Sequence, residues 1–176
     1  MIYFISDFHF NHKKMLETRA HFGLFSTLDG MNELMIERFN AKVSRSDTTY
    51  FFFFFSWGEP NQFLDRLNGK FIFIKGNHDA RIPDHEKIIY SKNGFYDSKF
   101  GEQKFTACHY PMHSWNCSHW GSWQFYGHHH YKTDFGGKSI NCTVDSLEFN
   151  PISWDEVVEY MKTRPDNWDL IKSDNT

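Results

Sequence analysis

The chain has little of what an exported, membrane-spanning or nucleic-acid-coating protein needs. Its three cysteines form no C-x-x-C pair and are odd in number, which favours a reduced, cytoplasmic protein. No apolar run approaches the length of a membrane span, and the apolar stretch near the N-terminus is too short for a signal peptide. A net charge of −3 provides no polycationic surface, so strong nonspecific nucleic-acid binding is not expected.

Histidine and aromatic residues are plentiful instead. Eleven histidines are spread through the 176 residues, and 20 phenylalanines, 8 tyrosines and 6 tryptophans predict an unusually aromatic core. The length fits one domain with a substantial core. We expect this domain to span residues 1–162, followed by a polar and loosely held tail over residues 163–176.

Apolar runs bounded by turn residues predict several strands. The 48–55 run contains five consecutive phenylalanines, so both faces of that strand should be buried, as in a central strand. Strands are expected over residues 1–6, 48–55, 70–75, 95–100, 103–108, 123–126 and 138–144.

Helical patterns lie between these strands and after the last of them. Residues 29–43 repeat apolar side chains every three or four positions, with Asp29 as the expected cap. A shorter helix is expected over residues 60–68. Residues 153–161 open with Ser153 and Glu156, which match a capping box. Strands and helices together predict a mixed α/β fold.

Polar ligand-type side chains follow several of the predicted strands. Gly76-Asn77-His78-Asp79 comes directly after the 70–75 run, where ligands bind in open α/β sheets. On its own this segment could simply close a turn, because Asn and Asp favour turns. Residues 7 and 9 alternate at the end of the first strand, so Asp7 and His9 should project to the same side.

Histidines end two further strands. His109 follows the 103–108 run, and His128 and His130 share a face after the 123–126 run, whereas His129 points the other way and is not expected to be a ligand. A structural zinc site usually takes four ligands in local pairs with cysteine, which this chain does not offer. Ligands at the ends of several strands therefore point to a catalytic metal centre.

The motifs Asp7-x-His9, Gly76-Asn77-His78-Asp79, His109 and Gly127-His128-x-His130 resemble the calcineurin-like metallophosphoesterase superfamily in order and approximate spacing. The resemblance spans residues 1 to about 145. Within this superfamily the sequence most resembles the small single-domain bacterial and phage phosphoesterases. It implies a four-layer αββα sandwich, in which two mixed β-sheets are flanked by helices. It also implies a centre of two divalent metal ions, drawn from Mn²⁺, Fe, Zn²⁺ or Ni²⁺.

The resemblance also implies a role for each matching residue. The reaction would be in-line attack on phosphorus by a metal-activated hydroxide, with His78 as proton donor to the leaving oxygen. His12 and Arg81 flank the motifs and either contact the substrate phosphate or are exposed residues without a role. One metal would be held by Asp7, His9 and His130, and the other by Asn77, His109 and His128.

One departure from the family pattern bears on activity. The bridging aspartate belongs to a Gly-Asp pair that aligns with Phe53-Phe54, and Phe54 cannot ligate a metal. Two dications about 4 Å apart repel strongly without a bridging carboxylate, so the second metal should bind weakly and hydrolysis should be slow. The sequence therefore predicts an impaired phosphoesterase for small or nucleotide-like phosphodiesters or phosphomonoesters. The alternatives are a non-catalytic binding or scaffold protein of the same fold and, less favoured by the acidic charge balance, a DNA nuclease.

Overall fold

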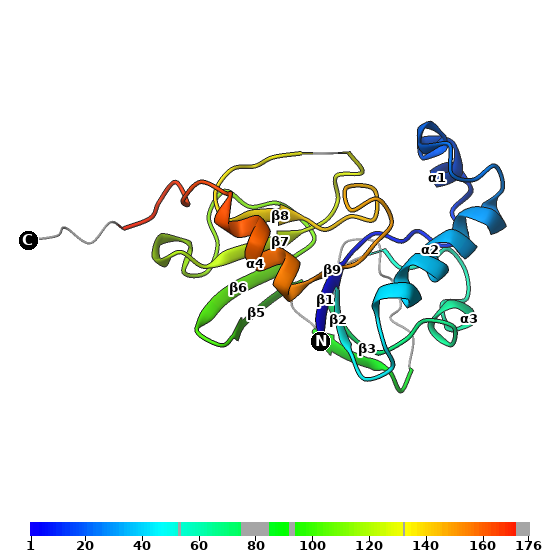
Figure 1. The fold of residues 1–176 in the computed structure, drawn as a ribbon, viewed down its shortest axis with the longest axis horizontal. Coiled ribbons are helices and arrows are strands. Elements are labelled where there is room, and N and C mark those ends of the chain that lie inside the picture. The colour runs from blue at the N-terminus through cyan, green and yellow to red at the C-terminus, as the bar shows by residue number, and fades with distance from the viewer. Residues whose placement is uncertain (53, 75–84, 92–93, 132, 172–176) are drawn as a thin grey trace, which may run out of the picture.

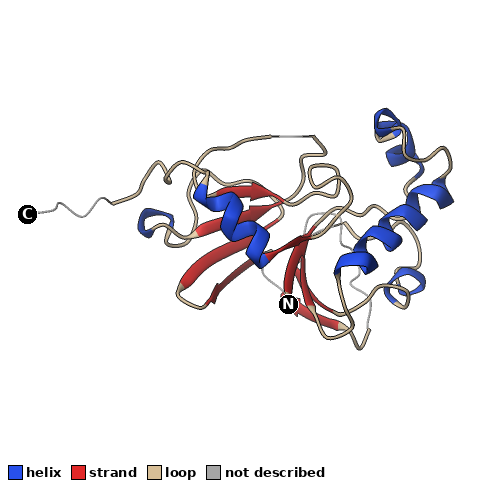
Figure 2. Cartoon of the chain, viewed as in Figure 1, coloured by secondary structure: helices blue, strands red, loops and turns tan. Residues whose placement is uncertain are grey.

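A computed structural model describes residues 1–52, 54–74, 85–91, 94–131 and 133–171. These form a mixed α/β protein with two mixed sheets and several helices (Figures 1 and 2). No helix in the described ranges has the length and apolar character to cross a membrane. The strands are β1 (Ile2–Ile5), β2 (Thr48–Phe52), β3 (Lys70–Ile74), β4 (Ile88–Ser91), β5 (Phe95–Phe100), β6 (Gln103–Cys108), β7 (Trp123–Tyr126), β8 (Ser139–Asn141) and β9 (Ile152–Ser153), and the helices are α1 (Lys13–Thr18), α2 (Leu28–Lys42), α3 (Asn61–Leu64) and α4 (Trp154–Lys162), with 3-10 turns η1 (Ala20–Phe22) and η2 (Ser118–Trp120).

The first sheet has the order β4-β3-β2-β1-β9, in which β1 to β4 run parallel and β9 runs antiparallel to β1. The second sheet has the order β5-β6-β7-β8, in which only the β5–β6 pair is antiparallel. A parallel bridge between Ser6 and Thr143 joins the segments that follow β1 and β8. The carboxyl ends of strands from both sheets therefore meet at one place in the fold.

Alternating side chains of the first sheet feed two separate apolar clusters, as the phenylalanine run predicts. Phe51 of β2 belongs to a cluster with α2 residues such as Phe39, on the side where Figure 1 shows α2. Its neighbour Phe52 belongs to a second cluster with Phe105 and Phe125 of the second sheet. Both faces of β2 are buried, and β2 lies between β1 and β3, so its prediction as a central strand is confirmed.

Several element boundaries differ from the sequence expectation. β2 ends at Phe52 rather than at residue 55, and β8 covers only Ser139–Asn141 of the expected 138–144. Thr27 rather than Asp29 caps α2, because the Thr27 side chain accepts a hydrogen bond from the Gly30 backbone N–H at 3.0 Å. α1 and β9 were not expected, because α1 has no side-chain cap and β9 is only two residues long. The capping box of α4 and the bounds of β5, β6 and β7 are confirmed.

The first part of the polar tail is held to the body of the protein, contrary to the expectation that it is loose. Asn167 is buried, and its Nδ2 donates to the carbonyl oxygens of Ser118 and Ser122 at 2.8 and 2.9 Å. Its Oδ1 accepts from the Lys138 backbone N–H at 2.7 Å. The tail satisfies buried backbone groups of the 118–122 loop, which composition alone does not reveal.

Candidate metal centre

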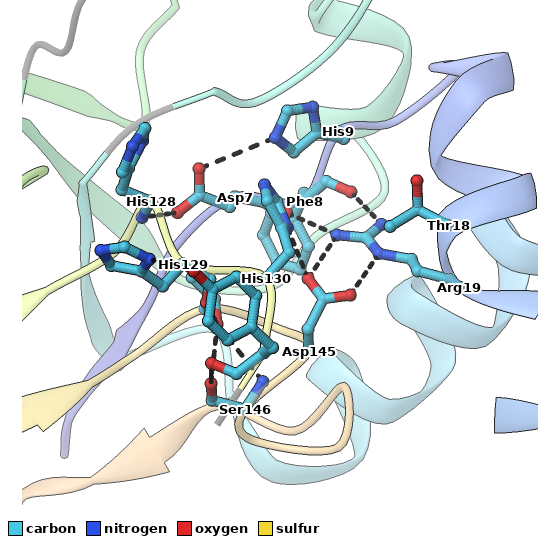
Figure 3. Close-up of polar contacts among 12 residues, drawn as sticks. Asp7, Phe8, His9, Thr18, Arg19, His128, His129, His130, Asp145 and Ser146 are labelled. Atoms are coloured by element: carbon cyan, nitrogen blue, oxygen red, sulfur yellow. Dashed lines mark hydrogen bonds and ion pairs between the residues drawn. The ribbon is translucent and has the colours of Figure 1, made fainter. Parts of the chain in front are cut away.

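Asp7, His9 and His130 form a compact group at the junction of the two sheets (Figure 3). Each offers one ligand atom, and these atoms all lie within 4.8 Å of one another. The Asp7 Oδ1 and His9 Nε2 atoms are 3.7 Å apart. Asp7 is buried. The three residues come from two distant parts of the chain, because His130 follows Asp7 and His9 by more than 100 positions. A carboxylate with two imidazoles is a donor set suited to a borderline divalent cation.

The backbone that presents this group is not the extended strand that the sequence predicts. β1 ends at Ile5, and Asp7 and His9 adopt left-handed φ angles of 59° and 53°. His128 is also left-handed, with φ of 70°. Such angles are strained for residues other than glycine and tend to cluster at functional sites. The expectation that Asp7 and His9 lie side by side is confirmed. The reason differs from the expected one, because left-handed backbone angles after β1, rather than alternation along a strand, bring the two side chains together.

Gly127 allows the loop after β7 to approach Asp7 closely. A Cβ atom on Gly127 would lie 2.4 Å from Asp7 Oδ2 and 2.6 Å from Ser6 Oγ, closer than real Cβ contacts allow. The next residue, His128, donates its backbone N–H to Asp7 Oδ2 at 3.1 Å. Asp7 therefore receives a backbone contact on one carboxylate oxygen and faces His9 with the other.

His109 and His128, expected as ligands of a second metal, lie next to the first group. His109 Nε2 and His128 Nδ1 are 3.0 Å apart, and His109 Nδ1 is 4.0 Å from Asp7 Oδ1. His109 is buried, whereas His128 is exposed. The structure thus brings these two imidazoles to the same end of the sheets. The other predicted residues of the centre, Asn77, His78 and Arg81, lie outside the described residues.

His12, a predicted substrate contact, lies beside the ligand group. Its Nδ1 is 3.0 Å from His9 Nδ1, so one proton is shared between the two rings. Its ring also stacks on Trp57, with centroids 5.2 Å apart. His129, which the sequence does not predict as a ligand, has its Nδ1 atom 3.3 Å from the Tyr131 hydroxyl oxygen.

Phe54, at the position where the resemblance implies a bridging aspartate, packs against His9. It is buried, and its ring stacks on the His9 imidazole with centroids 4.3 Å apart. The Phe54 carbonyl oxygen also accepts the His9 backbone N–H at 3.2 Å. An apolar ring therefore stands beside the candidate cation site at a position where the resemblance implies a carboxylate.

Two residues of the site were missed by the sequence analysis. Asp145 lies 2.8 Å from His130 Nδ1 through its Oδ2. Arg19, which is fully buried, donates to both oxygens of that carboxylate at 2.8 and 3.0 Å. Asp145 directly follows an expected strand, as Asp7 does. This position could have indicated Asp145 as a site residue from the sequence alone. Arg19 carries no signal in the sequence, because its contact with Asp145 joins residues 126 positions apart.

Burial and neighbouring charges set the protonation states of the group. Burial lowers the pKa of His9 and of His109 to about 4, so both imidazoles are neutral at pH 7. Burial acts to raise the pKa of Asp7, but the His9 hydrogen bond and the nearby imidazoles outweigh it and lower that pKa. The pKa of Asp145 is lowered to about 2, because the contacts with His130 and Arg19 outweigh its burial. Ionised carboxylates and neutral imidazoles are the forms that bind metals.

Comparison with known proteins gives relatives without an assigned activity. No protein-family model matches the chain. The chain is 31% identical over 173 residues to the uncharacterized protein MJ1445 of Methanocaldococcus jannaschii, covering 92% of this chain and 91% of that protein. Its structure resembles the protein of unknown function AQ665 from Aquifex aeolicus, with a TM-score of 0.72 at 20% identity, over 91% of this chain and 98% of that one. The latter similarity establishes a shared fold.

Proposed function

The chain belongs to the same protein family as MJ1445, and we propose that it is a metal-dependent phosphoesterase of the calcineurin-like type. Its substrates would be small or nucleotide-like phosphodiesters or phosphomonoesters. The observation that carries the proposal is the convergence of Asp7, His9 and His130 on one point. The four-layer αββα arrangement is part of the same proposal, supported by two mixed sheets that share an apolar cluster and by α2 on the opposite face of the first sheet.

The residues present fit a divalent cation. One carboxylate oxygen and two imidazoles lie within 4.8 Å of one another, and two of the three residues are largely buried. Because Asp145 occupies His130 Nδ1, the Nε2 atom of that ring is left as the ligand atom. This donor set suits Mn²⁺, Fe²⁺, Zn²⁺ or Ni²⁺. A cation bound there would polarise a phosphoryl oxygen and lower the pKa of a water molecule.

The neighbouring side chains have parts in the same proposal. His109 and His128, with Asn77, would hold a second cation next to Asp7. His78 would donate the proton to the leaving oxygen, and Arg81 and His12 would contact the phosphate. His12 is suited to this part because its ring lies beside His9 and is only half-buried.

Phe54 limits what the centre can do. Two dications about 4 Å apart repel by several kcal/mol even when well screened, and a bridging carboxylate normally offsets that repulsion. Because Phe54 offers no oxygen, the chain should bind one cation well, the second weakly, and hydrolyse slowly. The stacking of Phe54 on His9 also supports a second candidate function, a non-catalytic binding protein of the same fold.

Hydrolysis of bis(p-nitrophenyl) phosphate with added Mn²⁺ separates the two functions. A phosphoesterase should release nitrophenolate slowly in a Mn²⁺-dependent reaction, and the Asp7→Asn variant should abolish it. Asp134→Asn is the control, because it makes the same substitution at an exposed aspartate that pairs with Arg164 outside the candidate metal centre. Release that is absent, or equal in the Asp7→Asn variant, contradicts the proposal.

A further inference from the structure

The Arg19 guanidinium is fully buried and contacts two distant parts of the chain, residues 7–8 and Asp145 (Figure 3). Its Nε and Nη2 donate to the two carboxylate oxygens of Asp145 at 2.8 and 3.0 Å. Its Nη1 and Nη2 also donate to the backbone carbonyl oxygens of Phe8 and Asp7, each at 2.8 Å. Asp145 in turn contacts His130 at 2.8 Å. One side chain is thus linked to two of the three candidate ligands.

A buried ion pair of this kind needs an explanation other than stability. The desolvation of two charges offsets most of their attraction, and apolar residues of similar size often stabilise a core as well or better. Here the pair is almost completely buried, and among the described residues every contact of the guanidinium with an oxygen atom goes to residues 7–8 or to Asp145. Its Nη1 also lies 3.8 and 3.7 Å from the sulfur atoms of Met31 and Met35 of α2. The contacts fix geometry at the candidate metal centre.

We propose that Arg19 and Asp145 are positioning residues that hold His130 and Asp7 ready for a divalent cation. The inference rests on the proposed function only in taking Asp7, His9 and His130 as the cation site. Asp145 accepts the Nδ1 proton of His130 and so fixes the tautomer whose Nε2 lone pair is available. Arg19 holds the carbonyl oxygens of the left-handed turn that presents Asp7. Neither residue is among the cation ligands.

The test uses the full chain and two sets of variants. Asp145→Asn removes the charge with little change in shape, and it can unfold the protein by leaving the Arg19 charge buried and unpaired. The combined variant Arg19→Met with Asp145→Leu removes both charges and leaves none stranded. Asp134→Asn is the control, because it changes an Arg–Asp pair whose aspartate is exposed, in another part of the described structure.

Two measurements report on positioning without relying on turnover. Co²⁺ titration followed by visible absorbance should show affinity about 10- to 100-fold weaker in Asp145→Asn and in the combined variant, and unchanged in Asp134→Asn. Long-range ¹H–¹⁵N spectra of the cation-free wild type should show His130 as the Nδ1–H tautomer, and the combined variant should lose this preference.

The outcomes separate this inference from the proposed function. A combined variant that binds Co²⁺ as tightly as the wild type and keeps the Nδ1–H tautomer overturns the positioning role. A wild type that binds Co²⁺ through these residues but hydrolyses no phosphoester overturns the phosphoesterase and leaves the positioning role supported.

Discussion

The phenyl ring of Phe54 stacks on the imidazole of His9, with centroids 4.3 Å apart and planes inclined by 20°. His9 is a candidate metal ligand, and the resemblance to metallophosphoesterases implies a bridging aspartate at the position of Phe54. In the proposed two-metal centre, this contact places an apolar ring where the second cation would need an oxygen donor. We therefore expect Phe54 to limit the chemistry of the proposed centre.

Replacing Phe54 by aspartate should restore the missing ligand. We expect Phe54→Asp to bind a second Mn²⁺ and to hydrolyse bis(p-nitrophenyl) phosphate at least about 10-fold faster than the wild type. Without cations the same variant should be less stable, because it buries an uncompensated carboxylate beside the His9 ring. Phe54→Leu is the control, since it removes the ring and adds no ligand. Equal gains in both variants would contradict the ligand explanation, and no gain in either would favour the binding protein.

Adding a methyl group at Gly127 should disturb the cation site. The Cβ atom would lie 2.4 Å from Asp7 Oδ2, so the carboxylate or the loop must move. We expect Gly127→Ala to weaken Mn²⁺ binding and to reduce stability by about 1–3 kcal/mol. Gly23→Ala strains a left-handed residue in open space and should reduce stability without changing Mn²⁺ affinity. Calorimetric titration and urea unfolding of both variants give the comparison, and equal Mn²⁺ affinities would refute it.

The cation-free protein should lose stability on mild acidification. His9 and His109 each have a pKa of about 4 when folded and 6.5 when unfolded, because burial disfavours the charged imidazole. As the pH falls from 6.5 to 4, the unfolded chain binds protons that the folded chain does not. The free energy of unfolding should therefore fall by about 1.4 kcal/mol per pH unit for each imidazole over this range. Above pH 6.5 both imidazoles are neutral in the folded and in the unfolded chain, so they add no further pH dependence.

Urea unfolding in a chelator between about pH 4.5 and pH 7.5 measures this dependence. His109→Gln should have a shallower pH dependence than the wild type. His21→Gln should keep the wild-type slope, because His21 is exposed. A wild-type stability that does not change over this range would show that the two imidazoles are not buried in their neutral form.

Removing the Asn167 side chain should destabilise the domain although it lies beyond the last helix. Asn167 makes three hydrogen bonds, two from Nδ2 to carbonyl oxygens and one to Oδ1 from the Lys138 backbone. Leaving these buried groups unpaired should cost about 1–3 kcal/mol in Asn167→Ala. Asn150→Ala removes only an exposed hydrogen bond to Glu148 and should cost less than about 0.5 kcal/mol. Equal midpoints in thermal unfolding would mean that the tail is loosely held after all.

The fold was predictable where side-chain periodicity is strong. The five phenylalanines of residues 51–55 require burial on both faces, and β2 is indeed central, with Phe51 and Phe52 in different clusters. Ser153 and Glu156 predict the start of α4 correctly, because a capping box depends only on residues close together in the sequence. α1 and β9 were missed because tertiary contacts, rather than local sequence, stabilise such short elements.

The candidate site was predictable only in part, because its geometry depends on long-range contacts. The residue types after the strands indicated Asp7, His9 and His130 as neighbours, and the structure brings them together. The left-handed backbone that does so has no signature in residues that are not glycine. Arg19 was missed because an arginine is ordinarily a surface residue, and only the complete fold shows it against Asp145.

Calorimetric titration of the cation-free protein with Mn²⁺, for the wild type and His130→Ala, tests most directly whether these residues form a metal centre. We predict one well-bound Mn²⁺ per wild-type chain and a loss of most of that affinity in His130→Ala. A wild type that binds no Mn²⁺, or a His130→Ala variant that binds it equally well, would show that these residues do not form a metal centre.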